Sequence, residues 1–214
     1  MKLEKPLRID IKQWLGRLGV KGQADEDLQA IMETCERQLL QTAGPQGVYR
    51  VLDLDALRLE GTAIQKHLEG CGEMAVMAAT LGAGVDRMLR AAQIRDMAEA
   101  LILDCGASVL IEQICDQLEG QIRQEAQTFL TGRYSPGYGD LPIETQGQLL
   151  TALDAGRKIG LTVNKSHIMI PRKSVTAVLG MADHPVTGYL ATCGECALRE
   201  TCVLRKEGKS CAGF

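Results

Sequence analysis

The sequence predicts an α+β fold with a mixed or antiparallel central sheet, long helices packed on it, and a cysteine-rich C-terminal tail. Three observations lead to this fold class. Residues 84–130 place apolar side chains at helical spacing along most of their length. Residues 74–82 form an apolar run that ends in glycine and is typical of a buried strand. Residues 174–182 are rich in β-branched side chains, as strands are.

The segments before the predicted strand at residues 74–82 include both helices and strands. Residues 24–43 carry acidic side chains early and apolar ones on a single face, which predicts a helix. After a Gly-Pro-Gln-Gly turn, residues 48–54 and 57–62 have the pattern of short strands. We expect a short helix near residues 63–70.

The longest helical pattern contains a candidate break. Cys105 and Gly106 lie near the middle of residues 84–130, and glycine weakens a helix interior, so we expect two helices that meet there. Residues 142–160 begin with proline, end with glycine and have apolar side chains at helical spacing. They are predicted to form one more helix.

The last part of the chain divides into strands and a tail. Residues 161–170 and 174–182 flank Pro171 and are expected to be strands joined by a basic turn. We expect residues 1–190 to form a single domain and residues 191–214 to form the cysteine-rich tail.

Composition excludes several classes of function. The net charge of −3 gives no basic surface for nucleic acid. The charged N-terminus lacks the apolar core of a signal peptide, and no later segment is apolar for the ~18 residues that a membrane span needs. We therefore expect a cytoplasmic protein without membrane or nucleic-acid partners.

Two local motifs are too incomplete to define a site. After residues 74–82, Arg87 stands where a dinucleotide-binding loop would have its third glycine. His67 lies in a segment similar to the Asp-x-His-x-x-Gly pattern of proteins that ligate cobalamin through histidine, but Gln65 replaces the aspartate. We expect His67 to be a surface residue of a short amphipathic helix.

The tail carries a possible metal site. Its four cysteines follow the pattern C-x2-C-x5-C-x8-C and are Cys193, Cys196, Cys202 and Cys211. Four thiolates can hold a tetrahedral zinc ion or an iron-sulfur cluster, and the spacing leaves free thiols and a redox disulfide open as well. The other cysteines fall in apolar patterns and are expected to be small core residues: Cys35, Cys71, Cys105 and Cys115.

The segment RYSPGYGDLP, residues 133–142, is unusually rich in residues with special roles. Glycine and proline favour a turn, and an arginine with two tyrosines is also suited to a ligand-binding loop. The composition alone is compatible with both interpretations.

This segment also carries a resemblance to a known family. Together with a following helix that contains Gln146 and the run SHIMIPRKSVTA at 166–177, it resembles the activation domain of cobalamin-dependent methionine synthase, in particular its free-standing activation proteins. The shared pattern is Arg-x-x-Pro-Gly-Tyr followed by Ser-x-x-Met-x-Pro-x-x-Ser-Val. The resemblance extends over about residues 75–190, and residues 1–70 match only loosely.

The resemblance implies that the protein binds S-adenosylmethionine. The implied ligand residues are Arg133, Ser135, Gly137, Tyr138, Glu112 and Tyr189. Arg133 would pair with the ligand carboxylate, and Tyr138 would offer its ring to the adenine or the sulfonium. Glu112 would oppose a positive charge of the ligand. Taken alone, Glu112 also fits an ion pair on a helix face, and Tyr189 also fits a core position.

The function implied by the family is the rescue of an oxidised enzyme. Such a protein reactivates cob(II)alamin methionine synthase, or a related corrinoid protein, by reductive methylation to methylcobalamin. The partner presents the cobalamin, an electron donor supplies one electron, and S-adenosylmethionine supplies the methyl group. Because 214 residues leave no room for the synthase modules, we expect action in trans on a separate synthase in methionine biosynthesis.

Two other classes of function remain open. One is a stand-alone S-adenosylmethionine-dependent methyltransferase, although a glycine-rich Rossmann loop is missing. The other is a metal or iron-sulfur redox adaptor for another corrinoid protein, in which the cysteine tail is the functional part. In the activation protein itself, an iron-sulfur cluster on the tail would relay the electron to cobalt.

Overall fold

The computed structural model describes residues 1–189 and residue 200. Its helices are α1 (Ile11–Leu18), α2 (Glu26–Thr42), α3 (Thr62–His67), α4 (Ala83–Arg95), α5 (Met97–Ala126), α6 (Thr145–Leu153) and α7 (Ala155–Ile159). Its strands are β1 (Gln46–Asp53), β2 (Glu73–Thr80), β3 (Phe129–Leu130), β4 (Thr162–Val163), β5 (Met169–Ile170) and β6 (Ser174–Ala182). The long helices and the central strands confirm the predicted α+β class.

The central sheet is antiparallel and has the order β1-β2-β6-β3. In its register, Val76 of β2 lies opposite Arg50 on one side and Val178 on the other. All residues of β2 from Met74 to Thr80 are buried, because helices cover both faces of the sheet at this strand. Successive side chains of β2 therefore belong to two different hydrophobic clusters.

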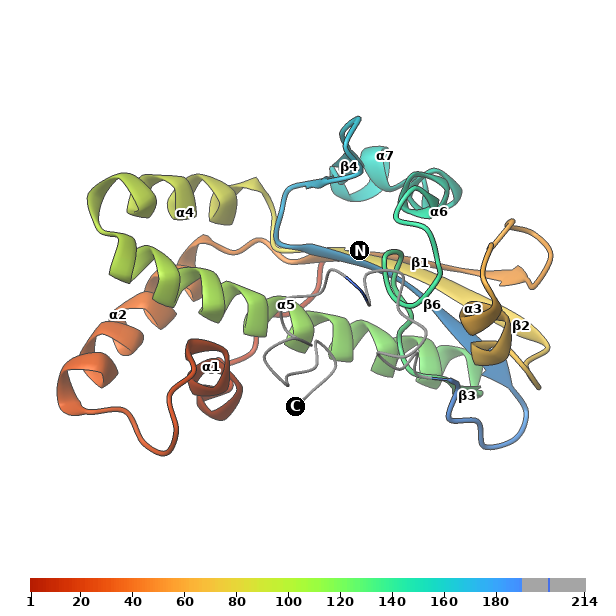
Figure 1. Cartoon of the computed structure of the whole chain (residues 1–214), viewed down its shortest axis with the longest axis horizontal. Helices are drawn as coiled ribbons and strands as arrows, with labels where there is room; N and C mark the ends of the chain where they lie inside the picture. Colours follow the sequence, from red (N-terminus) through yellow and green to blue (C-terminus); the bar gives the residue numbers. More distant parts are fainter. Residues whose placement is uncertain (190–199, 201–214) are drawn as a thin grey trace.

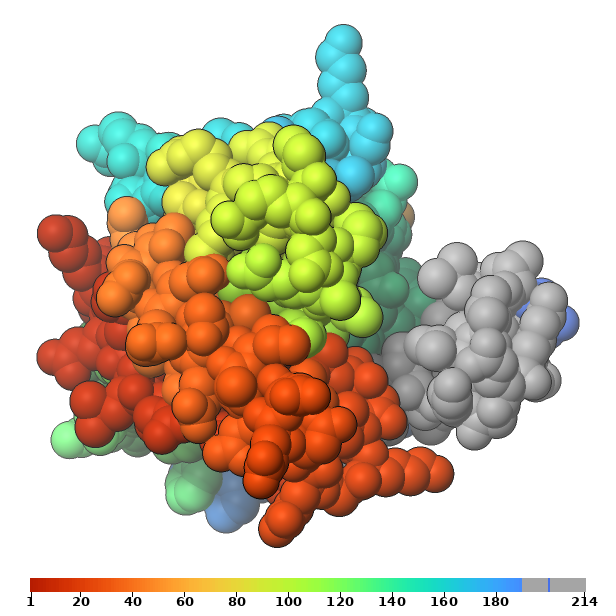
Figure 2. Space-filling view, turned by 90° about the vertical axis from the view of Figure 1, so that its left-hand side faces the viewer, coloured from red at the N-terminus to blue at the C-terminus, as the bar shows by residue number. Residues whose placement is uncertain are grey.

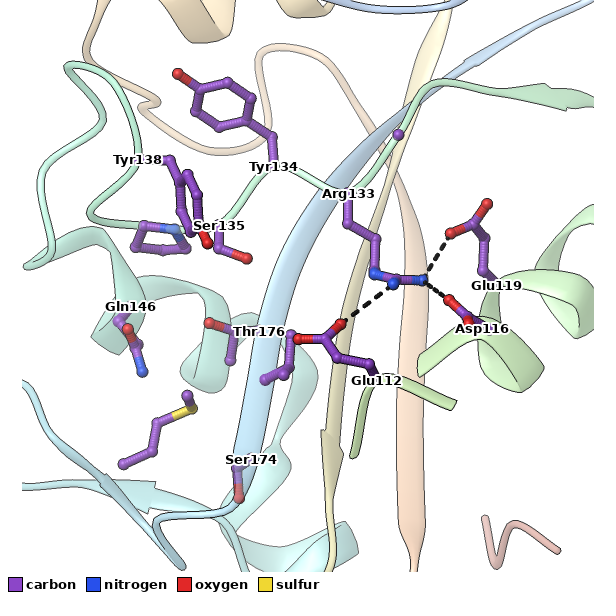
Figure 3. A pocket seen from close by; sticks show the side chains of 14 residues that line it. Glu112, Asp116, Glu119, Arg133, Tyr134, Ser135, Tyr138, Gln146, Ser174 and Thr176 are labelled. Atoms are coloured by element: carbon purple, nitrogen blue, oxygen red, sulfur yellow. Dashed lines mark hydrogen bonds and ion pairs between the residues drawn. The ribbon is translucent and has the colours of Figure 1, made fainter. Parts of the chain in front are cut away.

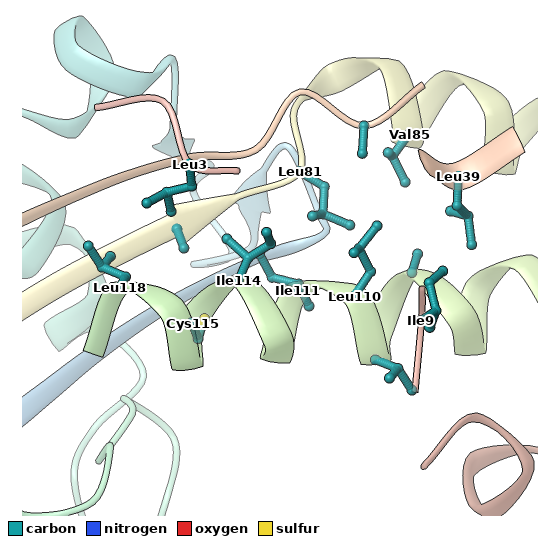
Figure 4. Close-up of a cluster of buried hydrophobic side chains, with 14 of the residues drawn as sticks. Leu3, Ile9, Leu39, Leu81, Val85, Leu110, Ile111, Ile114, Cys115 and Leu118 are labelled. Atoms are coloured by element: carbon teal, nitrogen blue, oxygen red, sulfur yellow. The ribbon is translucent and has the colours of Figure 1, made fainter. Parts of the chain in front are cut away.

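The larger cluster lies between the sheet and α5. Figure 1 shows α5 running the length of the molecule along one face of the sheet, and α1, α2 and α4 pack against it. The buried side chains of this cluster come from all of these elements (Figure 4); they include Leu39, Leu81, Val85, Leu110, Ile114 and Leu118. Figure 2 shows the end of the molecule where α5 begins, with α2 in orange beside the yellow to yellow-green surface of α4 and the start of α5.

The second cluster occupies the opposite face of the sheet. Met74, Val76 and Ala78 of β2 point into it, together with Val178 of β6. Helices α3, α6 and α7 close this face (Figure 1). Tyr134, from the segment that resembles the activation domain, is also buried here.

The predicted break near Cys105 and Gly106 is wrong, because α5 continues through both residues. The break lies instead at Asp96, whose carboxylate accepts hydrogen bonds from the N–H groups of Ala98 and Glu99 and so caps α5. Gly106 serves packing: a Cβ atom there would lie 2.6 Å from Cε2 of Trp14.

The predicted helix over residues 142–160 divides into α6 and α7. Asp154 ends α6 with a φ of 53°. Leu153 and Ala155 are both fully buried, although positions two apart point to nearly opposite sides of a continuous helix. The break lets both side chains face the core.

Two predicted strands also differ from the structure. Residues 57–62 form no strand, because the chain turns after Asp53 and then leads into α3. Residues 161–170 form a hairpin of β4 and β5 instead of one strand. The Asn164 side chain accepts hydrogen bonds from the N–H groups of Ser166 and Ile168, which reverses the chain.

The sequence patterns gave no indication of α1, whose Trp14 is buried in the larger cluster. Within the described part of the chain, no helix has the unbroken apolar length required to cross a bilayer.

Candidate functional site

The segment after β3 is held against the edge of β6. β3 pairs with β6 at only two positions, so the first half of β6 extends beyond it. The chain touches β6 again at Tyr134, which exchanges two backbone hydrogen bonds with Val178. Arg133 extends toward α5, whereas the ring of Tyr134 extends to the other side (Figure 3).

A tight turn follows, and it explains the two glycines. The Tyr138 N–H donates to the Ser135 carbonyl, and the Gly137 N–H donates to the Leu141 carbonyl. Gly137 has a φ of 89° and Gly139 a φ of 53°, a region that favours glycine. The segment is therefore a turn, and the same turn presents Ser135 and Tyr138 to the cavity described below.

Arg133 faces three carboxylates on α5. Its guanidinium lies 3.3 Å from Glu112, 2.8 Å from Asp116 and 2.9 Å from Glu119 (Figure 3). These positions follow the spacing i, i+4, i+7, which places them on one face of a helix. Arg123 also pairs with Glu119, so two cations and three anions meet at this corner and its net charge is negative.

The charges here affect the pKa values of Arg133 and Cys115. Burial by itself lowers the pKa of Arg133, but the neighbouring carboxylates of Asp116 and Glu112 raise it overall, so the guanidinium stays charged. Burial raises the pKa of the Cys115 thiol to about 12, although the charge of Arg133 acts in the opposite direction. Cys115 therefore remains a protonated thiol at neutral pH, which makes it unsuitable as a nucleophile.

These residues line a cavity of about 550 Å³ between α5, the turn and the edge of β6. Its walls are Glu112, Asp116, Glu119, Gly132, Arg133, Tyr134, Ser135, Pro136, Tyr138, Gln146, Met169, Ser174, Val175 and Thr176. The volume is in the range of small-molecule sites, roughly 300–1,000 Å³. Acidic side chains form one wall and the turn forms the facing one (Figure 3).

The structure brings together four of the six ligand residues expected from the family resemblance. Glu112, Arg133, Ser135 and Tyr138 line the cavity. Gly137 shapes the turn without lining the cavity. Tyr189 lies outside the cavity wall, where the Lys66 ammonium lies 5.1 Å from the centre of its ring.

The metal ligands predicted in the tail lie outside the described residues. They are Cys193, Cys196, Cys202 and Cys211. Among the residues that the structure does describe, no three His, Cys, Asp or Glu side chains are grouped so as to hold a metal ion.

Some residues of the site were missed in the sequence. Asp116 and Glu119 could have been found from their helical spacing with Glu112. Met169 and Thr176 belong to the run 166–177 that carries the family resemblance, but no pattern placed them beside the turn, because the meeting of β5 and β6 with the turn depends on the tertiary fold.

The expectation that His67 is a surface residue is wrong. Its side chain is fully buried at the end of α3, and it makes hydrogen bonds to segments around residues 132 and 189. A helical pattern shows which face of α3 is apolar. It cannot show that the segments at Gly132 and Tyr189 cover the histidine.

Comparison with known proteins supports the fold. No protein-family model matches the sequence, and the search of curated proteins found no match either. Among solved structures, the chain is similar to the MetH reactivation domain bound to AdoHcy, with a TM-score of 0.64. The match covers 94% of this chain and 82% of that one at 16% sequence identity, so it establishes a shared fold.

Proposed function

We propose that this protein binds S-adenosylmethionine and presents its methyl group to a cobalamin carried by a partner protein. The observation that carries the proposal is the cavity beside Arg133, whose acidic wall faces a turn rich in polar and aromatic groups. The fold adds support, because the similar MetH reactivation domain was solved with AdoHcy, the demethylated form of this ligand.

Charge complementarity favours this ligand. S-adenosylmethionine carries a sulfonium and an ammonium cation together with one carboxylate. The cavity offers the carboxylates of Glu112, Asp116 and Glu119 to the cations and the guanidinium of Arg133 to the anion. In a half-enclosed site such pairs interact more strongly than they do in water.

To bind the ligand carboxylate, Arg133 would exchange one of its present partners. Asp116 is the best candidate, because 62% of its side chain is exposed, compared with 18% for Glu119. Exposed ion pairs contribute little to stability, so the exchange costs little. Glu119 would keep the guanidinium oriented toward the cavity.

The aromatic part of the ligand has a partner as well. Tyr138 lines the cavity, where its ring would contact the adenine or the sulfonium. Ser135 and Gln146 would supply hydrogen bonds to the ribose or the adenine. The protein's contribution to the reaction is then positioning of the methyl group.

The specific reaction that we propose is the reactivation of cob(II)alamin methionine synthase, acting in trans. One electron reduces the cobalt, and the reduced cobalt takes the methyl group from the sulfonium. The C–S bond breaks as the cobalt–carbon bond forms, and its electron pair stays on sulfur, which gives S-adenosylhomocysteine. The electron must come from a separate one-electron donor.

Calorimetric titration with S-adenosylmethionine tests the binding. We expect Arg133→Lys to weaken binding about tenfold or more, because lysine keeps the charge but loses the bidentate geometry. Arg123→Lys is the matched control, since Arg123 pairs with the same Glu119 but does not line the cavity. Absence of binding by the wild type, or equal losses in both variants, would contradict the proposal.

Reactivation is tested by anaerobic mixing with a cob(II)alamin methionine synthase, S-adenosylmethionine and titanium(III) citrate as the one-electron reductant. We expect methylcobalamin absorbance to develop only when the protein is present, and more slowly with Arg133→Lys. Formation of methylcobalamin without the protein would refute the reactivation function. Turnover to S-adenosylhomocysteine without any corrinoid would instead favour a stand-alone methyltransferase.

A further inference from the structure

His67 joins two segments that are far apart in the sequence. One ring nitrogen, Nε2, lies 2.9 Å from the Gly132 carbonyl oxygen, immediately before Arg133. The other, Nδ1, lies 3.1 Å from the backbone nitrogen of Tyr189 and 2.8 Å from its backbone carbonyl oxygen. The buried imidazole thus bridges two segments. One is the start of the turn at residues 133–142, called the ligand turn below, and the other is the segment that carries Tyr189.

Both ring nitrogens of His67 have backbone hydrogen-bond partners. Nε2–H donates to the Gly132 carbonyl, and Nδ1 lies within hydrogen-bond distance of both the N–H and the carbonyl of Tyr189. The hydroxyl of Thr131 lies 2.8 Å from Nε2 and accepts a hydrogen bond from the Gly180 N–H of β6. The bridge is therefore anchored to the central sheet.

Close packing holds the ring from the remaining directions. The ring of Tyr134 lies 4.9 Å from the imidazole, centre to centre. Gly188 has a φ of 69°, and a Cβ atom there would lie 2.6 Å from Cε1 of His67. A glycine is required at this position for the segment before Tyr189 to approach the imidazole so closely.

The other end of α3 holds the far end of the same turn. The Asp140 carboxylate accepts hydrogen bonds from the N–H groups of Thr62, at 2.6 Å, and Ala63, at 3.1 Å. Helix α3 therefore contacts the ligand turn at both of its ends, through Asp140 and through Gly132. A short helix with two such contacts fixes the distance between the ends of the turn.

We infer that His67 is a positioning residue of the ligand site, which sets Arg133 through the Gly132 carbonyl and brings the Tyr189 segment to the same place. The inference rests on the proposed binding of S-adenosylmethionine. His67 itself lies outside the cavity wall and acts through its neighbours. The loosely matching first part of the chain thus supplies a residue that the ligand site needs.

Two substitutions in the 214-residue chain test this role. His67→Phe keeps a buried ring and removes both hydrogen bonds, so we expect S-adenosylmethionine affinity to fall about tenfold. In His67→Gln the side-chain amide reaches the position of Nε2 and can still donate to Gly132, so we expect most of the affinity to be recovered. Leu39→Ala is the control, because Leu39 is fully buried in the other cluster.

Comparison with Leu39→Ala separates positioning from a general loss of stability. Both His67→Phe and Leu39→Ala should lower the melting temperature, but at a temperature where both are folded only His67→Phe should bind S-adenosylmethionine more weakly. Unchanged affinity in His67→Phe, or an equal loss in Leu39→Ala, would overturn the inference.

Amide hydrogen exchange in the ligand-free protein provides a readout that does not depend on the ligand. His67→Phe should speed exchange in residues 131–138 and in residues 186–189, while Leu39→Ala leaves both segments as protected as in the wild type. Unchanged exchange in His67→Phe would refute the positioning role even if S-adenosylmethionine binds. A wild type that does not bind S-adenosylmethionine would refute the proposed function, and the exchange result would still decide the role of His67.

Discussion

At the scale of single residues, Gly106 shows how a side chain that is absent can determine packing. It lies inside α5, where glycine weakens a helix by about 0.5–1 kcal/mol relative to alanine. The structure uses the free space for the indole of Trp14, whose N–H donates to the Ile102 carbonyl at 2.9 Å. The packing of the Trp14 indole against Gly106 offsets the stability that glycine costs the helix.

Gly106→Ala should therefore destabilise the protein even though alanine is the better helix former. Overpacking of this kind costs about 1–3 kcal/mol, which urea denaturation would show. Trp14 is the sole tryptophan of the sequence, so displacement of the indole should also shift the emission maximum to longer wavelengths.

Gly120→Ala on the same helix is the matched control. A Cβ atom there meets nothing within 4 Å, so we expect a gain of up to about 1 kcal/mol and unchanged fluorescence. Equal stability of the two alanine variants would contradict the assigned role of Gly106.

The cavity beside Arg133 shows how far residue-level prediction reaches. The motif around Arg133 led to a turn that lines a cavity, and Glu112, Ser135 and Tyr138 lie with it. The ion pairs between Arg133 and α5 were not predicted as a set, since Arg133 follows the helix by a segment whose path is set by β3 and β6. The roles of all six residues as ligand contacts stay predictions, and Gly137 and Tyr189 also lie outside the cavity wall.

At the scale of elements, α3 is a helix of six residues that depends on its neighbours. Isolated helices of this length are not stable, and no side chain of its own first turn caps it. Asp140 supplies the cap from another segment. The turn and the helix thus stabilise each other.

Asp140→Ala should lower the free energy of unfolding by about 1 kcal/mol, as the loss of a capping side chain does. Asp140→Asn keeps an acceptor oxygen and should lose less. Urea denaturation of both variants checks this order. A loss of stability in Asp140→Asn as large as that in Asp140→Ala would contradict it.

The stability that Asp140 contributes should also depend on pH. Slight burial raises its pKa, but hydrogen bonds from Thr62 and Ala63 outweigh this and hold the pKa below its usual value. A carboxyl whose pKa is lower in the folded state stabilises the protein above its unfolded pKa, and this contribution is lost as the pH falls through the folded pKa. The difference in stability between wild type and Asp140→Asn should therefore shrink below about pH 4.

At the scale of the whole molecule, the cavity beside Arg133 and the cysteine tail are separate parts of the sequence. The cavity is built by residues between Glu112 and Thr176, and the tail cysteines begin at Cys193. Burial raises the pKa values of the four described cysteine thiols, Cys35, Cys71, Cys105 and Cys115, which disfavours the thiolate form that binds a metal. The tail cysteines are therefore the candidates for zinc or an iron-sulfur cluster.

Replacing the tail cysteines by serine should remove bound metal and leave ligand binding intact. The four positions are Cys193, Cys196, Cys202 and Cys211. After anaerobic purification we expect iron or zinc in the wild type, none in the variant, and S-adenosylmethionine affinities within about threefold of each other, because the proposed ligand contacts do not include the tail cysteines.

Metal analysis and calorimetry of the same preparations check both expectations. Absence of iron and zinc from the wild type would refute the metal site. Loss of S-adenosylmethionine binding together with the cysteines would instead favour a redox adaptor that depends on its tail.

The sequence by itself determined the types of most elements, because hydrophobic spacing and turn residues are local properties. It indicated the buried strand β2, the helical run of α4 and α5, and the turn at Arg133. Local patterns do not fix where helices end: the sequence predicts a break near Cys105 and Gly106, while the break lies at Asp96. Both residues carry a local signal, and only packing against Trp14 decides between them.

Only the tertiary structure decided which distant groups meet. The burial of His67 between Gly132 and Tyr189, the cap that Asp140 provides for α3, and the meeting of α5 with the edge of β6 join segments tens of residues apart. Such contacts depend on how the helices pack against the sheet. That packing is determined by the need to bury the apolar side chains on both faces of the sheet. The sequence thus determined the chemistry available to the site, and the packing of the layers determined its geometry.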